Sequence, residues 1–175
     1  HPYDRLIEII KEKKWDKLNI GVEMDSHYYT AFCHEKLLKG LPNAKVLDSE
    51  RLVNWARLIK SDEEIKLMKI ASEITQIGMK TAFDVINPGV RQCDAVAKIY
   101  SSLISGTKEY GGDYSAIVPL LPTGKGTSAS HLTWTDDKFV EGEASIIEIS
   151  GSYKKYHCPM ARTLLLGKPD QKKID

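Results

Sequence analysis

The chain has 175 residues, which is enough for one domain or for a small domain and part of another. Its 25 lysines and arginines balance 24 aspartates and glutamates, so the formal net charge of +1 gives no support to a nucleic-acid partner. Three cysteines without metal-ligand spacing, and the lack of a run as apolar as a membrane span or signal segment, favour a cytoplasmic protein with no membrane partner.

The first part of the chain alternates helical and strand patterns. Apolar residues recur at helical spacing in one stretch and alternate with polar residues in the next, and Asp25-Ser26 can cap the helix that follows. The predicted elements are a helix over 3–14, a strand over 18–24, a helix over about 26–41, a strand over 45–48 and a helix over about 50–58. This order is typical of an α/β layer.

A new unit is predicted to begin near residue 59. Ser61 and Glu64 have the spacing of a capping box, which predicts the start of a long helix that Asn87-Pro88-Gly89 ends. A second helix is predicted over about 91–105. Strands follow these two helices, so the second unit has the order of an α+β fold.

The predicted strands include one that contains a carboxylate. A strand over 116–121 includes Pro119, which favours a sheet edge or a bulge. A second strand over 144–150 is apolar except near its centre, at Glu148, and a tight hairpin leads to a return strand from Tyr156.

Glu148 and His131 are the candidate chemical groups. Burying an unpaired charge in a strand is costly, so Glu148 either forms an ion pair with Arg162 or Lys155 across the hairpin or takes part in chemistry. His131 follows a turn rich in glycine and serine, seventeen residues before Glu148. Imidazole changes its charge near neutral pH, so His131 either passes protons or is an ordinary loop residue bonded to the backbone.

Several motifs, taken in this order, resemble the creatinase and Xaa-Pro peptidase superfamily, whose catalytic domain has the pita-bread fold. They are Lys60-Ser61-x-x-Glu64, Asn87-Pro88-Gly89, the string 123–131, Gly142-Glu143 and the stretch from Glu148 to Arg162-Thr163. Within that superfamily the chain is similar to the ectoine hydrolases, which open the cyclic amidine of ectoine or hydroxyectoine. The strings that carry this similarity are 21–25, 52–55, 111–114, 117–124, 131–134 and 156–159.

The resemblance implies a fold and a domain organisation. Residues 1–58 correspond to the C-terminal part of a creatinase-like N-terminal α/β domain, and residues 59–175 to the N-terminal half of a pita-bread catalytic domain. In that fold the second half carries further catalytic residues, usually including another glutamate. We therefore expect the chain to be a fragment, nearly inactive alone, of a parent that forms a homodimer.

The chain departs from the superfamily at a metal ligand. The metallopeptidases of this fold hold two divalent ions with, among other ligands, two aspartates eleven residues apart on adjacent strands. Here the first position is Glu148 and the second is Pro159, whose side chain has no metal-binding atom. We therefore expect no metal and no cofactor.

The expected function is that of a metal-independent hydrolase that converts the small molecule ectoine or hydroxyectoine to an N-acetylated diaminobutyrate. Glu148 would attack the amidine carbon or act as general base for a water, and His131 would pass protons. A cationic amidinium would itself be the partner of the Glu148 charge. The residues expected to contact substrate are Asp113, Tyr114, Trp134, Tyr156 and His157.

Two points stay open at the level of sequence. Tyr156 and His157 alternate on the return strand, so only one of them can face the pocket. The alternatives to the amidine hydrolase are a metallohydrolase like the Xaa-Pro dipeptidases or aminopeptidases, and a catalytically inactive pita-bread module used for binding.

Overall fold

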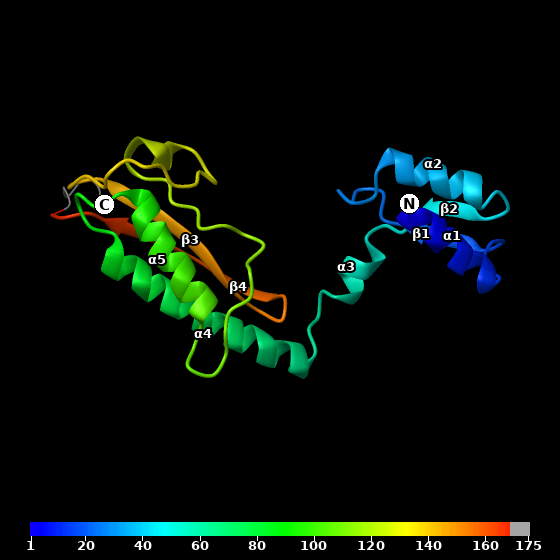
Figure 1. The fold of residues 1–175 in the computed structure, drawn as a ribbon, viewed down its shortest axis with the longest axis horizontal. Coiled ribbons are helices and arrows are strands. Elements are labelled where there is room, and N and C mark those ends of the chain that lie inside the picture. The colour runs from blue at the N-terminus through cyan, green and yellow to red at the C-terminus, as the bar shows by residue number, and fades with distance from the viewer. Residues whose placement is uncertain (169–175) are drawn as a thin grey trace. The chain divides into compact units, whose positions relative to one another are not determined.

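The computed structural model describes residues 1–168 and divides the chain into two compact units (Figure 1). The first unit is residues 1–59 and the second begins at Lys60, one residue from the expected boundary. Each unit has its own hydrophobic core.

The first unit is a small α/β layer. It contains α1 (Pro2–Glu12), β1 (Asn19–Val22), α2 (Ala31–Gly40), β2 (Lys45–Asp48) and the short α3 (Leu52–Ala56). The two strands are parallel, and the α1 and α2 side chains Ile7, Ile10 and Leu37 are buried in the core beside them.

The predicted start of α2 was wrong by several residues. Thr30 is the N-cap, and its hydroxyl oxygen accepts a hydrogen bond from the Cys33 amide at 3.3 Å. The Ser26 hydroxyl oxygen instead accepts from the Tyr28 amide, which closes a local turn before the helix begins. Residues of this type cap turns as readily as helices, so the sequence pattern alone did not distinguish the two.

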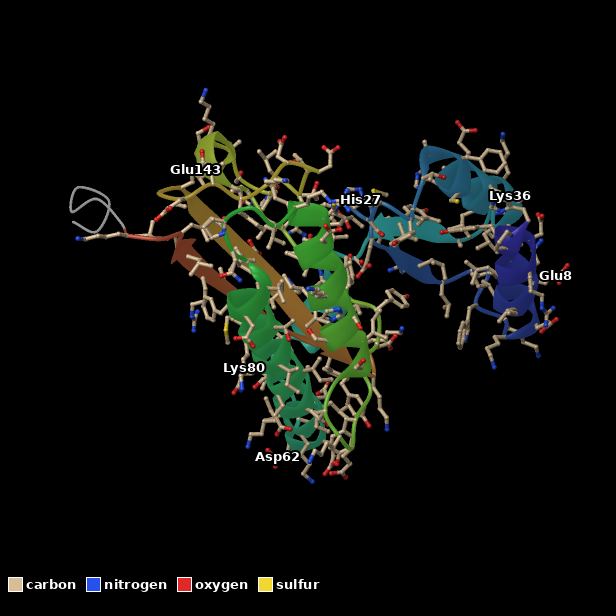
Figure 2. The ribbon with its side chains drawn as sticks, turned by 60° about the vertical axis from the view of Figure 1, so that its left-hand side comes forward. Glu8, His27, Lys36, Asp62, Lys80 and Glu143 are labelled. Carbon is tan, nitrogen blue, oxygen red and sulfur yellow. The ribbon has the colours of Figure 1, made fainter. Side chains whose placement is uncertain are left out.

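The second unit consists of two helices packed on a hairpin. It contains α4 (Asp62–Val85), α5 (Gln92–Ser105), the 3₁₀ turn η1 (Gly124–Ser128), β3 (Ala144–Tyr153) and β4 (Tyr156–Leu165). Figure 2 marks Asp62 at the N-terminal end of α4 and Lys80 further along this helix. No helix among residues 1–168 combines the length and the apolar character needed to cross a membrane.

The capping box at the start of α4 is confirmed. The Glu64 carboxylate accepts a hydrogen bond from the Ser61 amide at 2.7 Å, and the Ser61 hydroxyl oxygen accepts one from the Glu64 amide at 3.4 Å. Two backbone donors at the helix end are therefore satisfied by side chains.

β3 and β4 pair antiparallel from Ala144 opposite Leu165 to Tyr153 opposite Tyr156. Alternate β3 side chains, including Ile147 and Ile149, are fully buried in the core with residues of α4 and α5. Thr75 joins α4 to both strands: its hydroxyl donates to the Cys158 carbonyl at 2.6 Å and accepts from the Gly151 amide at 2.8 Å. The face of β3 that carries Glu148 is the opposite one.

The strand predicted over 116–121 is reduced to isolated bridges. Leu120 pairs with Glu148, the Leu120 amide donating to the Glu148 carbonyl at 2.9 Å and the reverse bond measuring 3.0 Å. A second bridge joins Thr123 to Ser145. The Pro122 carbonyl accepts from the Ile146 amide at 3.0 Å, but Pro122 has no amide hydrogen to return the bond, so the pairing does not extend as a regular ladder.

Candidate active site

Glu148 and His131 line the same pocket. This pocket has a volume of about 250 Å³. Its other lining residues are Leu120, Pro122, Thr127, Ala129, Ser130 and Ile146. Pockets for drug-sized ligands usually measure about 300–1,000 Å³, so this one suits a compound smaller than that class.

Three segments build the pocket. Glu148 and Ile146 come from one face of β3, Leu120 and Pro122 from the segment bridged to that strand, and the remaining residues from η1 and the turn after it. The two backbone bonds between Leu120 and Glu148 fix the first two segments relative to one another. The Glu148 carboxylate therefore projects from a hydrogen-bonded strand and not from a loop.

His131 has a left-handed backbone, with φ of +60°. This conformation is uncommon outside glycine and costs free energy, although histidine adopts it more often than most residues. Such strain gathers at functional sites, where a side chain must be aimed in a particular direction. His131 is an exposed residue that lines the pocket containing Glu148.

Neither ion pair that would give Glu148 a structural role is formed in the described part of the chain. Arg162 lies opposite Ile147, so it shares the other face of the hairpin, and its guanidinium donates to the Ala161 carbonyl at 2.7 Å. Lys155 pairs instead with Asp113, at 2.8 Å. The half-buried Glu148 carboxylate is thus left facing the pocket.

Pro159 lies on the same face of the hairpin as Glu148. Glu148 is opposite Ala161 and Ser150 is opposite Pro159, so Pro159 is the diagonal neighbour of Glu148 across the strands. A carboxylate at position 159 would therefore be within reach of an ion held by Glu148, and proline removes that ligand.

This chain lacks one of the oxygen ligands that a dinuclear metal site of this superfamily would take from the hairpin. Among residues 1–168, no group of three or more histidine, cysteine, aspartate or glutamate side chains is arranged to hold an ion. Hard divalent ions need several oxygen ligands, and Pro159 supplies none at the position where the resemblance places the second aspartate.

Three of the expected substrate contacts gather at the hairpin tip. Asp113, Tyr114 and His157 surround Lys155, which lies with Lys154 in the two-residue turn between β3 and β4. Ser152 lies opposite His157, four residues from Glu148 along β3. At about 3.4 Å per residue this is roughly 14 Å, which is too far for one small ring to contact both places.

The other two expected contacts face the core or α4. Trp134 packs against the core of the second unit, with its ring 6.3 Å from that of Tyr100. The Tyr156 hydroxyl donates to the Glu64 carboxylate of α4 at 2.8 Å, so Tyr156 faces α4 and His157 takes the face that carries Glu148. The pKa of Glu64 lies below its usual value mainly because its carboxylate accepts a hydrogen bond from the Ser61 amide, and further because it accepts one from the Tyr156 hydroxyl.

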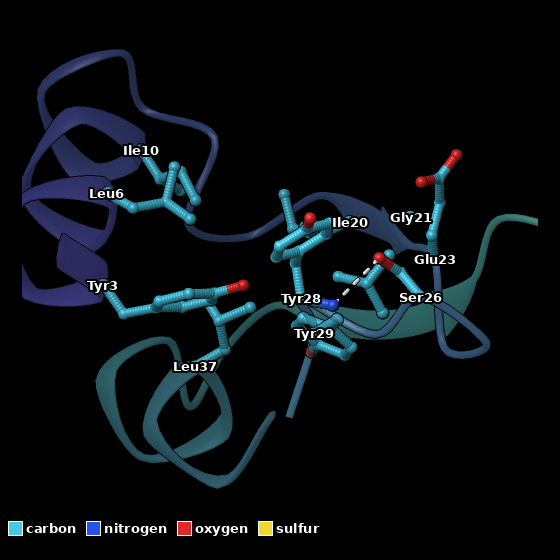
Figure 3. A pocket seen from close by; sticks show the side chains of 11 residues that line it. Tyr3, Leu6, Ile10, Ile20, Gly21, Glu23, Ser26, Tyr28, Tyr29 and Leu37 are labelled. Carbon is cyan, nitrogen blue, oxygen red and sulfur yellow. Dashed lines mark hydrogen bonds between the residues drawn. The ribbon is translucent and has the colours of Figure 1, made fainter. Parts of the chain in front are cut away.

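The two larger of the other pockets contain none of the predicted site residues. One, of about 660 Å³, shares Pro122 with the candidate site and is also lined by Lys125, Lys138 and Glu143. The other lies in the first unit and measures about 360 Å³ (Figure 3). Its lining combines tyrosines with aliphatic side chains: Tyr3, Leu6, Ile10, Ile20, Gly21, Val22, Glu23, Ser26, Tyr28, Tyr29 and Leu37.

The sequence analysis missed the rest of the pocket lining. Thr127 and Ser130 stand beside His131 in the glycine- and serine-rich turn, which was the available signal for them. Leu120 could be assigned to the pocket only once its bridge to Glu148 was known.

The sequence of this chain is similar to a known protein family and to several of its members. Metallopeptidase family M24 matches residues 66–175. Ectoine hydrolase from Halomonas elongata is 45% identical over 175 residues, which covers 97% of this chain and 44% of that protein. A Xaa-Pro dipeptidase from Pyrococcus furiosus is 24% identical and covers 97% of this chain and 46% of that protein.

Solved structures show the same fold. An X-Pro aminopeptidase from Thermotoga maritima superimposes with a TM-score of 0.83 at 18% identity, covering 98% of this chain and 46% of that one. Prolidase from Pyrococcus furiosus gives 0.77 at 21% identity, covering 98% and 47%. This likeness confirms the α+β, pita-bread architecture, and the chain spans about half the length of the relatives it matches. The family match and the identity to the Halomonas protein together show that the chain belongs to metallopeptidase family M24.

Proposed function

We propose that this chain carries part of the active site of a hydrolase that opens the cyclic amidine of ectoine or hydroxyectoine. The observation that carries the proposal is the convergence of Glu148 and His131 on one small pocket, on the hairpin face where Pro159 replaces an acidic ligand. The 45% identity to an ectoine hydrolase supports the substrate class.

Glu148 has two possible roles in this reaction. As nucleophile, its carboxylate oxygen forms a bond to the amidine carbon, the bond from that carbon to one ring nitrogen breaks, and water then hydrolyses the resulting adduct. As general base, it takes a proton from a water whose oxygen forms a bond to the same carbon, and the bond from that carbon to one ring nitrogen then breaks as the nitrogen is protonated. Both routes consume one water and yield an N-acetylated diaminobutyrate.

His131 supplies the proton that the departing nitrogen needs. Breaking the ring bond leaves a poor leaving group unless the nitrogen is protonated as the bond breaks. An imidazole on the pocket wall can donate this proton and recover it from water, which is the usual role of histidine in general acid–base catalysis. The strained backbone at His131 fits a side chain whose direction matters.

The positive charge of the substrate amidinium balances the negative charge of Glu148. In the described part of the chain Glu148 makes no ion pair, so a planar cation in the pocket is its natural partner. The same charge match would position the amidine carbon against the carboxylate before the reaction. The peptidase is a weaker alternative because a peptidase of this family would need the metal ligand that Pro159 lacks. The inactive binding module is weaker because Glu148 and His131 line one pocket.

Further residues must complete the site. The pocket is open, and about half the length of the relatives has no counterpart in these 175 residues. We propose that another part of a longer polypeptide, or a partner chain, closes the pocket, that the chain alone is nearly inactive, and that the whole protein is a cytoplasmic homodimer.

The test uses a chimaera in which this chain replaces the matching segment of the Halomonas elongata ectoine hydrolase. We expect the chimaera to hydrolyse ectoine and Glu148→Gln to lower kcat by about 10³-fold or more, while His131→Asn lowers it by about 10²-fold. Glu141→Gln, the same chemical change at an exposed position seven residues earlier, is the matched control and should have no effect. Full activity in Glu148→Gln would refute the proposal.

A further inference from the structure

The turn at the hairpin tip places two non-glycine residues in the unfavourable left-handed backbone conformation. Lys154 and Lys155 form a two-residue turn with φ of +47° and +69°. Turns of this kind favour asparagine and glycine, because a side chain in the left-handed region is strained. Two consecutive lysines there suggest that at least one of the side chains has a use that offsets the strain.

Lys155 uses its position to hold a loop. Its ammonium nitrogen lies 2.8 and 2.9 Å from the two carboxylate oxygens of Asp113 and 3.9 Å from the centre of the Tyr114 ring. The ammonium thus joins an ion pair to a cation–π contact. The hydrogen bond between the two residues lowers the pKa of Asp113 and raises that of Lys155.

Two more contacts join the same loop to the hairpin. The Asp113 amide donates to the Ser152 carbonyl at 2.8 Å. The His157 Nε2 accepts from the Ala116 amide at 3.0 Å, which leaves its Nδ1–H to donate to the Lys155 carbonyl at 2.9 Å. His157 therefore binds the loop through one ring nitrogen and the turn through the other.

The far end of this loop is part of the Glu148 pocket. From Asp113 to Leu120 the chain advances seven residues, while β3 covers only four between their partners Ser152 and Glu148. The loop must therefore bulge, and its course depends on how its first residues are held. Leu120, at its end, both pairs with Glu148 and lines the pocket.

We propose that Lys155 is a positioning residue: by holding Asp113 and Tyr114 at the hairpin tip, it fixes the 113–120 loop and thereby the wall of the Glu148 pocket that Leu120 forms. The consequence for catalysis rests on the proposed function. Because Lys155 lies far from Glu148, it affects how well substrate binds and not the chemical step.

The first test measures the loop in the 175-residue chain. Amide hydrogen exchange at Ala116 and Leu120, followed by NMR, should be about three- to tenfold faster in Lys155→Met than in the unsubstituted chain. Lys155→Arg should restore slow exchange because it keeps the charge and the ring contact. Lys154→Met is the matched control, with the same turn and the same left-handed backbone, and should leave both amides unchanged. Unchanged exchange in Lys155→Met would overturn the proposal.

The second test measures KM and kcat for ectoine in the chimaera. Lys155→Met should raise KM by about three- to tenfold with kcat unchanged, and Lys155→Arg should return KM to its original value. Faster exchange without a change in KM would overturn the link from the loop to the pocket. If the unsubstituted chimaera does not hydrolyse ectoine, the proposed function fails, while the exchange experiment still decides whether Lys155 positions the loop.

Discussion

Gly151→Ala is the substitution that most directly tests how β3 is held against α4. A Cβ at this position would lie 2.5 Å from the Ala71 carbonyl oxygen, 2.7 Å from the Thr75 amide nitrogen and 2.9 Å from the Ile74 Cβ. Two of these three atoms belong to the helix backbone, which cannot move aside as the end of a side chain can. We therefore expect α4 and β3 to separate locally.

The expected change in unfolding free energy for Gly151→Ala is the sum of two destabilising contributions and one stabilising contribution. Overpacking a tight contact costs about 1–3 kcal/mol, and weakening the bond from the Gly151 amide to Thr75 costs about 1 kcal/mol more. Replacing glycine by alanine returns about 0.4–1 kcal/mol by restricting the unfolded chain. The net loss in unfolding free energy should be about 2–3 kcal/mol.

Two other glycines supply graded controls. At Gly78 the new Cβ would meet the ends of the Leu103 and Ile149 side chains, and alanine is the better helix former by about 1 kcal/mol, so we expect a net loss of about 0–1 kcal/mol. At Gly126 the nearest atom is 3.6 Å away, an ordinary contact, and Gly126→Ala should be nearly neutral.

The assay is urea unfolding followed by Trp134 fluorescence. Trp15→Phe and Trp55→Phe remove the tryptophans of the first unit, so that Trp134 alone reports on the second. With a denaturant slope of about 1–1.5 kcal/mol/M, Gly151→Ala should lower the midpoint by roughly 2 M. A midpoint for Gly151→Ala within error of that for Gly126→Ala would refute the packing described for β3 and α4.

Three further outcomes are expected. Thr75→Val should lower the unfolding free energy by about 1–3 kcal/mol in the same assay, because it leaves the buried Gly151 amide without an acceptor, and a neutral result would contradict the network. Glu64→Gln should destabilise the second unit at pH 7, and the deficit should shrink as the pH falls. A carboxylate with a lowered pKa stabilises the fold above its unfolded pKa, and that contribution is lost as the pH falls through the folded pKa, so a deficit that does not change with pH would argue against it. Pro159→Asp should make the chain bind Mn²⁺ more tightly in calorimetric titration, and no gain would show that positions 148 and 159 do not share a ligand position.

The features that sequence predicted well are set by local chemistry. The capping box joins residues three apart, and the strand around Glu148 was predicted from the apolar residues on either side of it. The hairpin between β3 and β4 is likewise a short-range feature, and the structure confirms it.

The features that sequence missed depend on contacts distant in the chain. The alternation of side chains along a strand showed that Tyr156 and His157 face opposite ways. Which of the two faces α4 depends on the hydrogen bond from Tyr156 to Glu64, a residue 92 positions away in the chain. Asp113 and Lys155 are 42 residues apart, so nothing local indicated their pairing. The distance of this cluster from Glu148 also depends on the register of β3 with the loop, which only the structure provides.

The central claim is that Glu148 acts in hydrolysis without a pair of metal ions. Its most direct test is the rate of ectoine hydrolysis by the chimaera after chelation, with the divalent metal content of the same sample measured. We expect the rate to be unchanged with far less than one divalent ion per chain. Loss of activity on chelation, restored in proportion to two bound divalent ions per chain, would contradict the claim.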